Sequence, residues 1–180
     1  PDMGGSDFTA RNRAILAGRS VPSRSETKAM IVRIARQQGV DPRLALAIAY
    51  QESQWDPIAT SETGVRGLMQ LTEETARHLG VVDRLDAKSS AIGAARYLAD
   101  LKSKLPARIA EPDRTWLALA AFNIGIAHLE DARILAQRQK LNPDLWTDVR
   151  KMLPLLAEPE YYVSAKYGYA RGGMPVAFVG

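Results

Sequence analysis

The chain has 180 residues, enough for one ordinary domain with a buried core. Its longest apolar runs, such as Trp116 to Phe122, are far shorter than the roughly 20 residues that cross a bilayer. Cysteine is absent, which excludes disulfide bonds and thiolate metal sites. The net charge of +4 suits an acidic partner such as nucleic acid, anionic lipid or an anionic cell-wall polymer, and selects none of them.

The two ends of the chain suggest a processed or excised fragment. It opens at Pro1 rather than at Met, shows no signal peptide, and stops at Gly180 inside an apolar segment. Residues 1–22 contain several glycines and few apolar side chains, so we expect a partly ordered leader there. The remaining residues, 23–180, are expected to form one domain that is truncated at its C-terminus.

Helix signals become dense after the leader. Ser23 and Glu26 have the spacing of a capping box, and Asp41-Pro42 is an N-cap followed by proline at the first helical position. No stretch of four or more residues shows convincing β alternation, so the predicted fold class is all-α. The expected helices are Ser23 to Gln38, Pro42 to about Ser53, a short one between Thr72 and Gly80, about 87–105, Pro112 to near Gly125, about 127–140, 143–153 and 160–170, the last ended by Gly172-Gly173.

One carboxylate falls on the apolar face of a predicted helix. Glu52 shares a face with Ala45, Ile48 and Ala49 on the helix that begins at Pro42. Burial there would raise the pKa of the Glu52 carboxyl, and a general acid working near neutral pH needs a raised pKa. Taken alone, this helix favours the simpler interpretation, in which Glu52 lies at the last turn and points into solvent.

The segment 59–70 follows as a loop rich in glycine and hydroxyl side chains. Gly64 and Gly67 can adopt positive φ or let the backbone approach a ligand closely. Ser61 and Gln70 offer hydrogen bonds, and Met69 offers an adaptable apolar wall. Most loops of this composition are only connectors, so the composition alone is a weak signal.

The spacing of these residues resembles the signature of the soluble-lytic-transglycosylase superfamily, which is related to goose lysozyme. A second block, Ala120-Ala121-Phe122-Asn123-Ile124-Gly125, is similar to another family segment, with Phe122 where the family has Tyr. A third, Tyr167 to Gly173, looks like the subgroup of membrane-bound lytic murein transglycosylase F. The first match comprises Glu52-Ser53, Pro57, Ala59, Ser61, Gly64 and Gly67-Leu68-Met69-Gln70.

The resemblance implies a lysozyme-like helical fold with a sugar-binding cleft, and an enzyme that cleaves the MurNAc-β-1,4-GlcNAc bond of peptidoglycan. Glu52 would protonate the glycosidic oxygen and then accept the proton of the muramoyl 6-hydroxyl, which forms a 1,6-anhydro end. Ser61 would orient Glu52 or the substrate's acetamido group. No metal or cofactor is implied. The substrate-binding residues implied are Ser61, Gly67, Met69, Gln70, Phe122, Asn123, Tyr162 and Phe178.

The carboxylates near Glu52 agree with such a scheme. Ordinary glycoside hydrolysis uses two carboxylates, roughly 5–10 Å apart. Asp56 and Glu62 are the nearby candidates in the sequence, and we expect neither to have a direct chemical role. Asp56 precedes Pro57 at a helix exit, which is a common turn position.

Two registers fit the Glu and Tyr that family members carry near the final helix. One places them at Met174 and Phe178, so both polar groups would be missing. The other uses Glu158 with Tyr162 and fits the subgroup less well. We favour the first, which would leave Glu52 with fewer hydrogen-bond partners than in typical relatives.

The resemblance further implies a monomer in the periplasm, acting on peptidoglycan glycan strands, with outer-membrane association through a segment outside this chain. A hydrolytic, lysozyme-like activity and an inactive wall-binding module are the alternatives. The basic cluster Arg133, Arg138 and Lys140 is interleaved with acidic residues, which favours a solvated helix face over a nucleic-acid site. Trp116 is expected in the core.

Overall fold

The computed structural model describes residues 18, 20–61 and 64–180. Most of the leader expected at 1–22 lies outside these residues. The chain forms two compact units, residues 1–97 (unit 1) and 98–180 (unit 2), and the boundary falls within helix α5 (Ala87–Lys104). Each unit is described by itself below, and the expectation of a single domain at 23–180 stays a prediction.

The described residues of unit 1 contain three complete helices, whose ends follow the local sequence. The Ser23 hydroxyl accepts from the Glu26 amide (3.2 Å), and the side chains of Asp41 and Thr72 cap the two helices that follow them. Gly39 and Gly80 end their helices at φ +72° and +74°, where glycine has no steric penalty. The helices are α2 (Arg24–Gln38), α3 (Pro42–Ser53) and α4 (Glu73–Leu79).

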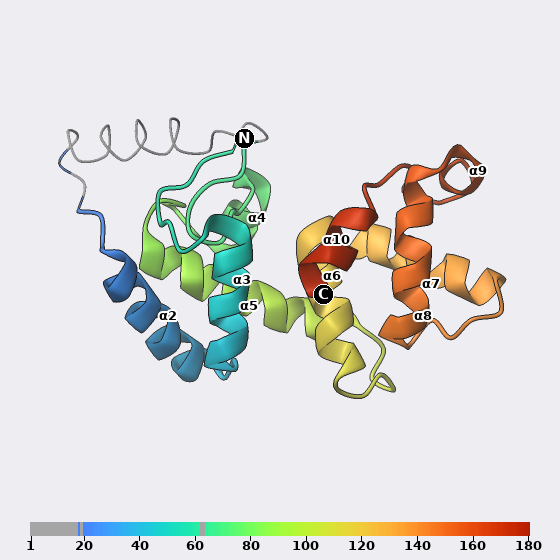
Figure 1. Cartoon of the computed structure of the whole chain (residues 1–180), viewed down its shortest axis with the longest axis horizontal. Helices are drawn as coiled ribbons and strands as arrows, with labels where there is room; N and C mark the ends of the chain where they lie inside the picture. Colours follow the sequence, from blue (N-terminus) through green and yellow to red (C-terminus); the bar gives the residue numbers. More distant parts are fainter. Residues whose placement is uncertain (1–17, 19, 62–63) are drawn as a thin grey trace. The chain divides into compact units, whose positions relative to one another are not determined.

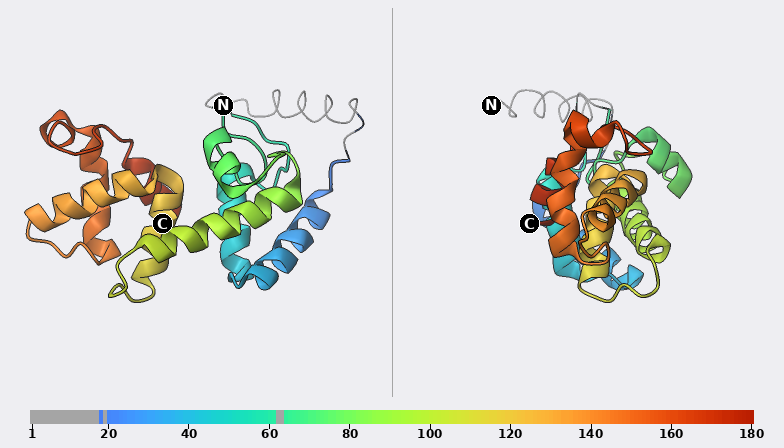
Figure 2. Two further views of the ribbon diagram at one scale, coloured as in Figure 1. Left: turned by 180° about the vertical axis from the view of Figure 1, so that it is seen from behind. Right: turned by 90° about the vertical axis from the view of Figure 1, so that its right-hand side faces the viewer.

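Helix α2 packs beside α3 (Figure 2), and both helices contribute buried apolar side chains to the core of unit 1. Ile31 and Ile34 of α2 are each 1% exposed, and Ala49 of α3 is fully buried. Gly93 of α5 lies so close to Val81 that a Cβ there would come within 2.6 Å of the valine Cγ2. The absence of a side chain at Gly93 thus lets α5 pack closely against Val81.

Unit 2 is built on α6, whose residues Leu117 to Ala121 are all buried. The last helix, α10, packs against α6 (Figure 1). It also contacts the segment at Leu153, and Gly172 allows that contact because a Cβ there would overlap the Leu153 carbonyl. The elements after α5 are α6 (Asp113–Ile124), α7 (Ile126–Arg138), α8 (Trp146–Met152), the 3₁₀ helix η1 (Leu153–Ala157), α9 (Pro159–Tyr162) and α10 (Gly173–Val179).

The all-α prediction is confirmed. Among the described residues there is no strand, only isolated bridges that join Arg66 to Thr60 and to Leu71. Trp116, in contrast, is 38% exposed rather than in the core, because the first turn of α6 stays accessible and burial begins at Leu117.

Two expected helices in unit 2 have different bounds. The helix expected at 143–153 begins at Trp146, because the Asn142 side chain caps a turn by accepting from the Asp144 amide (2.9 Å). The helix expected at 160–170 ends at Tyr162 as α9. Gly168 has φ +72°, and the Ala170 amide donates to Leu156 rather than along a helix, so the chain turns and then forms α10.

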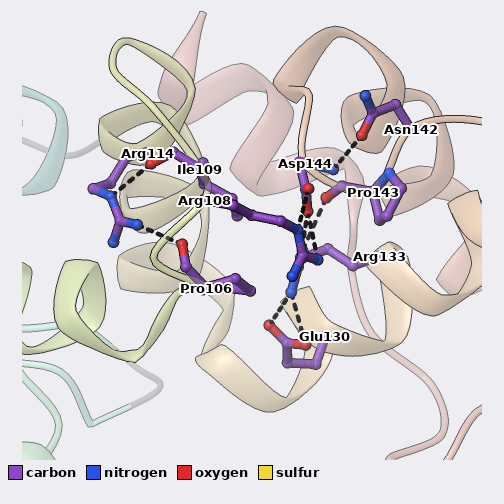
Figure 3. A network of polar contacts seen from close by, with 9 residues as sticks. All are labelled: Pro106, Arg108, Ile109, Arg114, Glu130, Arg133, Asn142, Pro143 and Asp144. Atoms are coloured by element: carbon purple, nitrogen blue, oxygen red, sulfur yellow. Dashed lines mark hydrogen bonds and ion pairs between the residues drawn. The ribbon is translucent and has the colours of Figure 1, made fainter.

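The expected solvated basic face is wrong for Arg133, which is 6% exposed. Its guanidinium donates to the Pro143 carbonyl (2.9 Å), to both oxygens of Glu130 and to Asp144 (2.8 Å), as Figure 3 shows. Arg108 also donates to Asp144 and holds the pKa of that carboxyl below its usual value, with Arg133 adding to the effect. Arg133 thus joins α7 to the turn before α8.

We expect Arg133→Met to lower the free energy of unfolding by roughly 3 kcal/mol, because it removes the partner of buried hydrogen-bonding groups. Chemical denaturation measures this change. The control is Arg138→Met on the same helix, an exposed residue that makes no ion pair within the described part of the chain and should change stability by about 0.5 kcal/mol or less. Equal effects of the two variants would contradict the role given to Arg133.

Candidate functional site

Glu52 lies in the last turn of α3, on the same face as the buried residues of that helix. Ile48 is 7% exposed, Ala49 is fully buried, and Ala45 is half-buried on the same face. Glu52 itself is partly buried, and this burial raises the pKa of its carboxyl to about 7. The Glu52 carboxyl can therefore hold a proton near neutral pH, as a general acid must.

The chain turns sharply after Glu52. Gln54 and Trp55 both adopt positive φ (51° and 62°), which is uncommon for residues other than glycine. The Trp55 indole N–H donates to the Leu46 carbonyl (3.0 Å), and the Lys28 ammonium lies 4.0 Å from the ring centre. The Trp55 ring is therefore tied to α3 and contacts a cation from α2.

The turn leads into a loop that we define as residues 59–61 and 64–71 and call the Gly67 loop. Its backbone folds back on itself, since the Gly67 amide donates to Ala59 (2.7 Å) and the Leu71 amide to Arg66 (3.1 Å). The Gln70 side-chain amide donates to the carbonyls of Ala59 (3.1 Å) and Gly67 (2.8 Å). The loop is therefore held partly by its own side chain.

Three side chains outside the Gly67 loop also bind its backbone. The Ser53 hydroxyl donates to the Leu68 carbonyl (2.6 Å), directly beside Glu52 in the chain. The hydroxyl of Ser90, which is fully buried in α5, accepts from the Met69 amide (3.3 Å). The Arg84 guanidinium donates to two further carbonyls of the loop. The loop is thus fixed between the end of α3 and the start of α5.

The predicted site residues of unit 1 all lie on α3 or this loop, in different settings. Ser61 is exposed, and its amide donates to Val65 (3.0 Å). Met69 is only 4% exposed, and a Cβ on Gly67 would come within 1.8 Å of the Arg84 carbonyl oxygen. Gln70 uses its amide within the loop. Their roles in binding a substrate stay predictions.

The two other nearby carboxylates are placed differently. An oxygen of Asp56 accepts from the Ile58 amide (3.1 Å), so this side chain caps the turn before the Gly67 loop. Glu62 lies outside the described residues. Within the described residues, no group of three or more His, Cys, Asp or Glu side chains could hold a metal ion.

Unit 2 brings together two of its predicted site residues. Phe122 in α6 and Phe178 in α10 stack in parallel, with ring centres 6.2 Å apart and an interplanar angle of 1°. Tyr162 in α9 makes an edge contact with Tyr169 (5.6 Å), and Asn123 is half-buried in the last turn of α6. The favoured register thus places Met174 and Phe178 on α10, while the alternative places Tyr162 on α9.

Sequence reasoning missed Ser53, Arg84 and Ser90 as supports of the loop. Ser53 stands in the matched motif, which does carry a signal. Arg84 and Ser90 lie 13 and 19 residues after Leu71, and no local pattern connects them with the loop.

Comparison with known proteins identifies the family. The model of the "Transglycosylase SLT domain" matches residues 29–144, which include Glu52, the Gly67 loop and Phe122. Proteins called "Membrane-bound lytic murein transglycosylase F" are similar to the chain. One from Methylobacillus flagellatus is 64% identical over 141 residues, 78% of this chain and 30% of that protein.

Two Pseudomonas proteins with the same name are nearly as similar. That of Pseudomonas savastanoi pv. phaseolicola is 60% identical over 145 residues, 81% of this chain and 29% of its own length. That of Pseudomonas putida is 59% identical over 145 residues, 81% of this chain and 30% of its own. The chain thus spans about three-tenths of the length of these curated relatives. Because the family model covers well over half of the sequence, the chain belongs to the transglycosylase SLT domain family.

Proposed function

We propose that the chain is the catalytic domain of a peptidoglycan lytic transglycosylase, with Glu52 as its acid and base. The observation that carries this proposal is a partly buried carboxyl with a pKa of about 7, inside the family's sequence signature. At pH 7 about half of such carboxyl groups are protonated, so both the acid and the base form are accessible.

The proposed reaction needs one carboxyl group that works twice. Protonated Glu52 gives its proton to the glycosidic oxygen as the bond from C1 to that oxygen breaks. The Glu52 carboxylate then takes the proton of the muramoyl 6-hydroxyl as that oxygen bonds to C1. No water is consumed, and Glu52 ends protonated as it began.

The setting of Asp56 supports a scheme with one carboxylate. Ordinary hydrolysis would require a second carboxylate to activate water or attack C1. Asp56 follows Glu52 closely in the chain, and one of its oxygens is engaged by the Ile58 amide. An internal hydroxyl of the substrate needs no such partner.

Glycan contacts are proposed for both units separately. In unit 1 the proposed contacts come from Ser61 and from the loop backbone, whose conformation depends on Gly67, Met69 and Gln70. The side-chain amide of Gln70 donates to two carbonyls of the loop itself, so Gln70 is proposed to act through the shape of the loop. In unit 2 the proposed contacts are Phe122, Asn123, Tyr162 and Phe178.

A cell-envelope location agrees with the relatives, whose names describe membrane-bound enzymes. We propose the periplasm, a monomer, and outer-membrane association through a segment that is not in this chain. Within the described residues, the helices are too short or too polar to span a membrane.

We expect Glu52→Gln to lower the rate of product release from peptidoglycan sacculi at least a hundredfold, because the amide can neither donate nor accept the required proton. Mass spectrometry of the soluble products measures this rate. The matched control is Glu74→Gln, which changes an exposed glutamate in α4 and should leave the rate unchanged.

The same mass spectra distinguish the alternative functions. Wild-type products should carry 1,6-anhydro ends. Reducing ends, heavier by one water, would indicate a lysozyme-like hydrolase. Binding to sacculi without any product over long incubation would indicate an inactive wall-binding module.

The pKa of Glu52 predicts the basic limb of the pH profile. The acid must be protonated in the free enzyme, so kcat/KM on a soluble glycan fragment should fall as the pH rises above about 7. Rates measured between about pH 4 and pH 9 define this limb. A limb near 4.5, the ordinary value for glutamate, would contradict the burial of the acid.

A stability measurement tests the same carboxyl without any substrate. Because the folded-state pKa of Glu52 is raised, its contribution to stability is fully present below about 4.5 and is lost as the pH rises through about 7. Glu52→Gln avoids this loss. We therefore expect the variant to be more stable than wild type by on the order of 2 kcal/mol at pH 8, and the difference to shrink at pH 4. Chemical denaturation of both proteins measures this difference, and an equal difference in the free energy of unfolding at pH 8 and at pH 4 would contradict the raised pKa of Glu52.

A further inference from the structure

Arg84 lies between α4 and α5 in unit 1, outside the residues of the sequence signature. Its Nη1 donates to the carbonyl of Gly64 (2.8 Å) and to the carbonyl of Leu71 (3.0 Å). These two acceptors stand on opposite branches of the Gly67 loop, seven residues apart in the chain. One guanidinium therefore joins the two branches, and charge-assisted hydrogen bonds of this kind are stronger than neutral ones.

The backbone of Arg84 contacts the same loop. Gly67 has φ +85°, and a Cβ there would come within 1.8 Å of the Arg84 carbonyl oxygen. Arg84 thus meets the loop with both its main chain and its side chain. This contact with Arg84 requires glycine at position 67, so the presence of Gly67 in the signature does not need to be explained by the approach of a ligand.

Arg84 is itself held firmly. The Asp83 side chain accepts from the Leu85 amide (3.0 Å), and the Asp86 amide donates to the Asp83 carbonyl (3.1 Å). This turn runs directly into α5, whose Ser90 binds the Met69 amide. The turn that carries Arg84 and the start of α5 are therefore both joined to the Gly67 loop by hydrogen bonds.

The other side of the loop rests on the helix of the acid. The hydroxyl of Ser53, the neighbour of Glu52, donates to the Leu68 carbonyl (2.6 Å), and its oxygen lies 3.1 Å from the Ala49 carbonyl oxygen, so the single proton is shared at most between the two. A loop released from Arg84 would have to move on this contact, since the chain between Leu68 and Leu71 is short. Its movement would change the surroundings of Glu52 and the position of Ser61.

We propose that Arg84 is a positioning residue that holds the Gly67 loop against the end of α3, and thereby sets the surroundings of Glu52 and the place of Ser61. The effect on catalysis rests on the proposed function, while the effect on the loop does not. Arg84 acts on the loop and is not assigned any contact with the substrate.

The test compares Arg84→Met, which keeps most of the aliphatic stem and removes the donors, with Arg84→Lys, which restores one cationic donor. The control is Arg77→Met on α4, an exposed residue whose ion pair with Glu73 (3.4 Å) does not involve the loop. All variants are made in the full chain.

Amide hydrogen exchange measures directly how firmly the Gly67 loop is held. In Arg84→Met the amides of Arg66, Gly67 and Leu71, which are hydrogen-bonded within the loop, should exchange at least tenfold faster. The amides in the middle of α2 should keep their rates. Arg84→Lys should fall between wild type and Arg84→Met, and Arg77→Met should match wild type.

Kinetics on a soluble glycan fragment read the consequence for Glu52. In Arg84→Met, kcat/KM per folded molecule should fall roughly tenfold to a hundredfold, with partial rescue in Arg84→Lys. The basic limb of the pH profile should move to lower pH, because water reaches Glu52 when the loop loosens and its pKa then falls.

Unchanged exchange in the loop would overturn the proposal. So would a loss of rate that merely follows the unfolded fraction, with the basic limb unmoved and no rescue by lysine. If the wild-type chain itself releases no product, the proposed function fails, and hydrogen exchange alone then decides whether Arg84 holds the loop.

Discussion

The burial of the Glu52 carboxyl is the constraint on which the arrangement of unit 1 depends, because shielding from water raises the pKa of this group to about 7. The shielding comes from the apolar end of α3, where Ile48 and Ala49 are buried beside Glu52. Burial of an ionisable group costs free energy, so the rest of the unit must keep the helix end from rearranging. The hydrogen bond from Ser53 to Leu68 does this most directly, because it joins the residue after Glu52 to the Gly67 loop.

Much of this arrangement could be predicted because its signals are local. Caps, prolines and glycines marked the ends of α2, α3 and α4, and the helical period placed Glu52 on the apolar face. The supports of the Gly67 loop could not be predicted in the same way. Arg84 and Ser90 form hydrogen bonds with loop residues that are distant from them in the sequence. No local pattern around an arginine before a helix identifies the acceptors to which it donates.

Unit 2 shows the same limit for buried charge. A helix with alternating basic and acidic residues favours the interpretation of a solvent-exposed face. Arg133 is nevertheless buried, because the turn at Pro143 and Asp144 supplies hydrogen-bond acceptors that the sequence of α7 does not indicate. The short α9 followed by α10 has a similar cause. Gly172 permits a close approach to Leu153 that only the folded unit reveals.

The two consecutive residues with positive φ after Glu52 have a consequence for how the domain can be altered. Gln54 is exposed and adopts φ 51° as the residue that ends α3. A side chain in this conformation costs about 1 kcal/mol relative to glycine. The backbone N–H of Gln54 donates to the Tyr50 carbonyl, and this hydrogen bond does not depend on the side chain. Replacing Gln54 by glycine would therefore remove this conformational cost and stabilise the domain, at a position two residues after Glu52 in the chain.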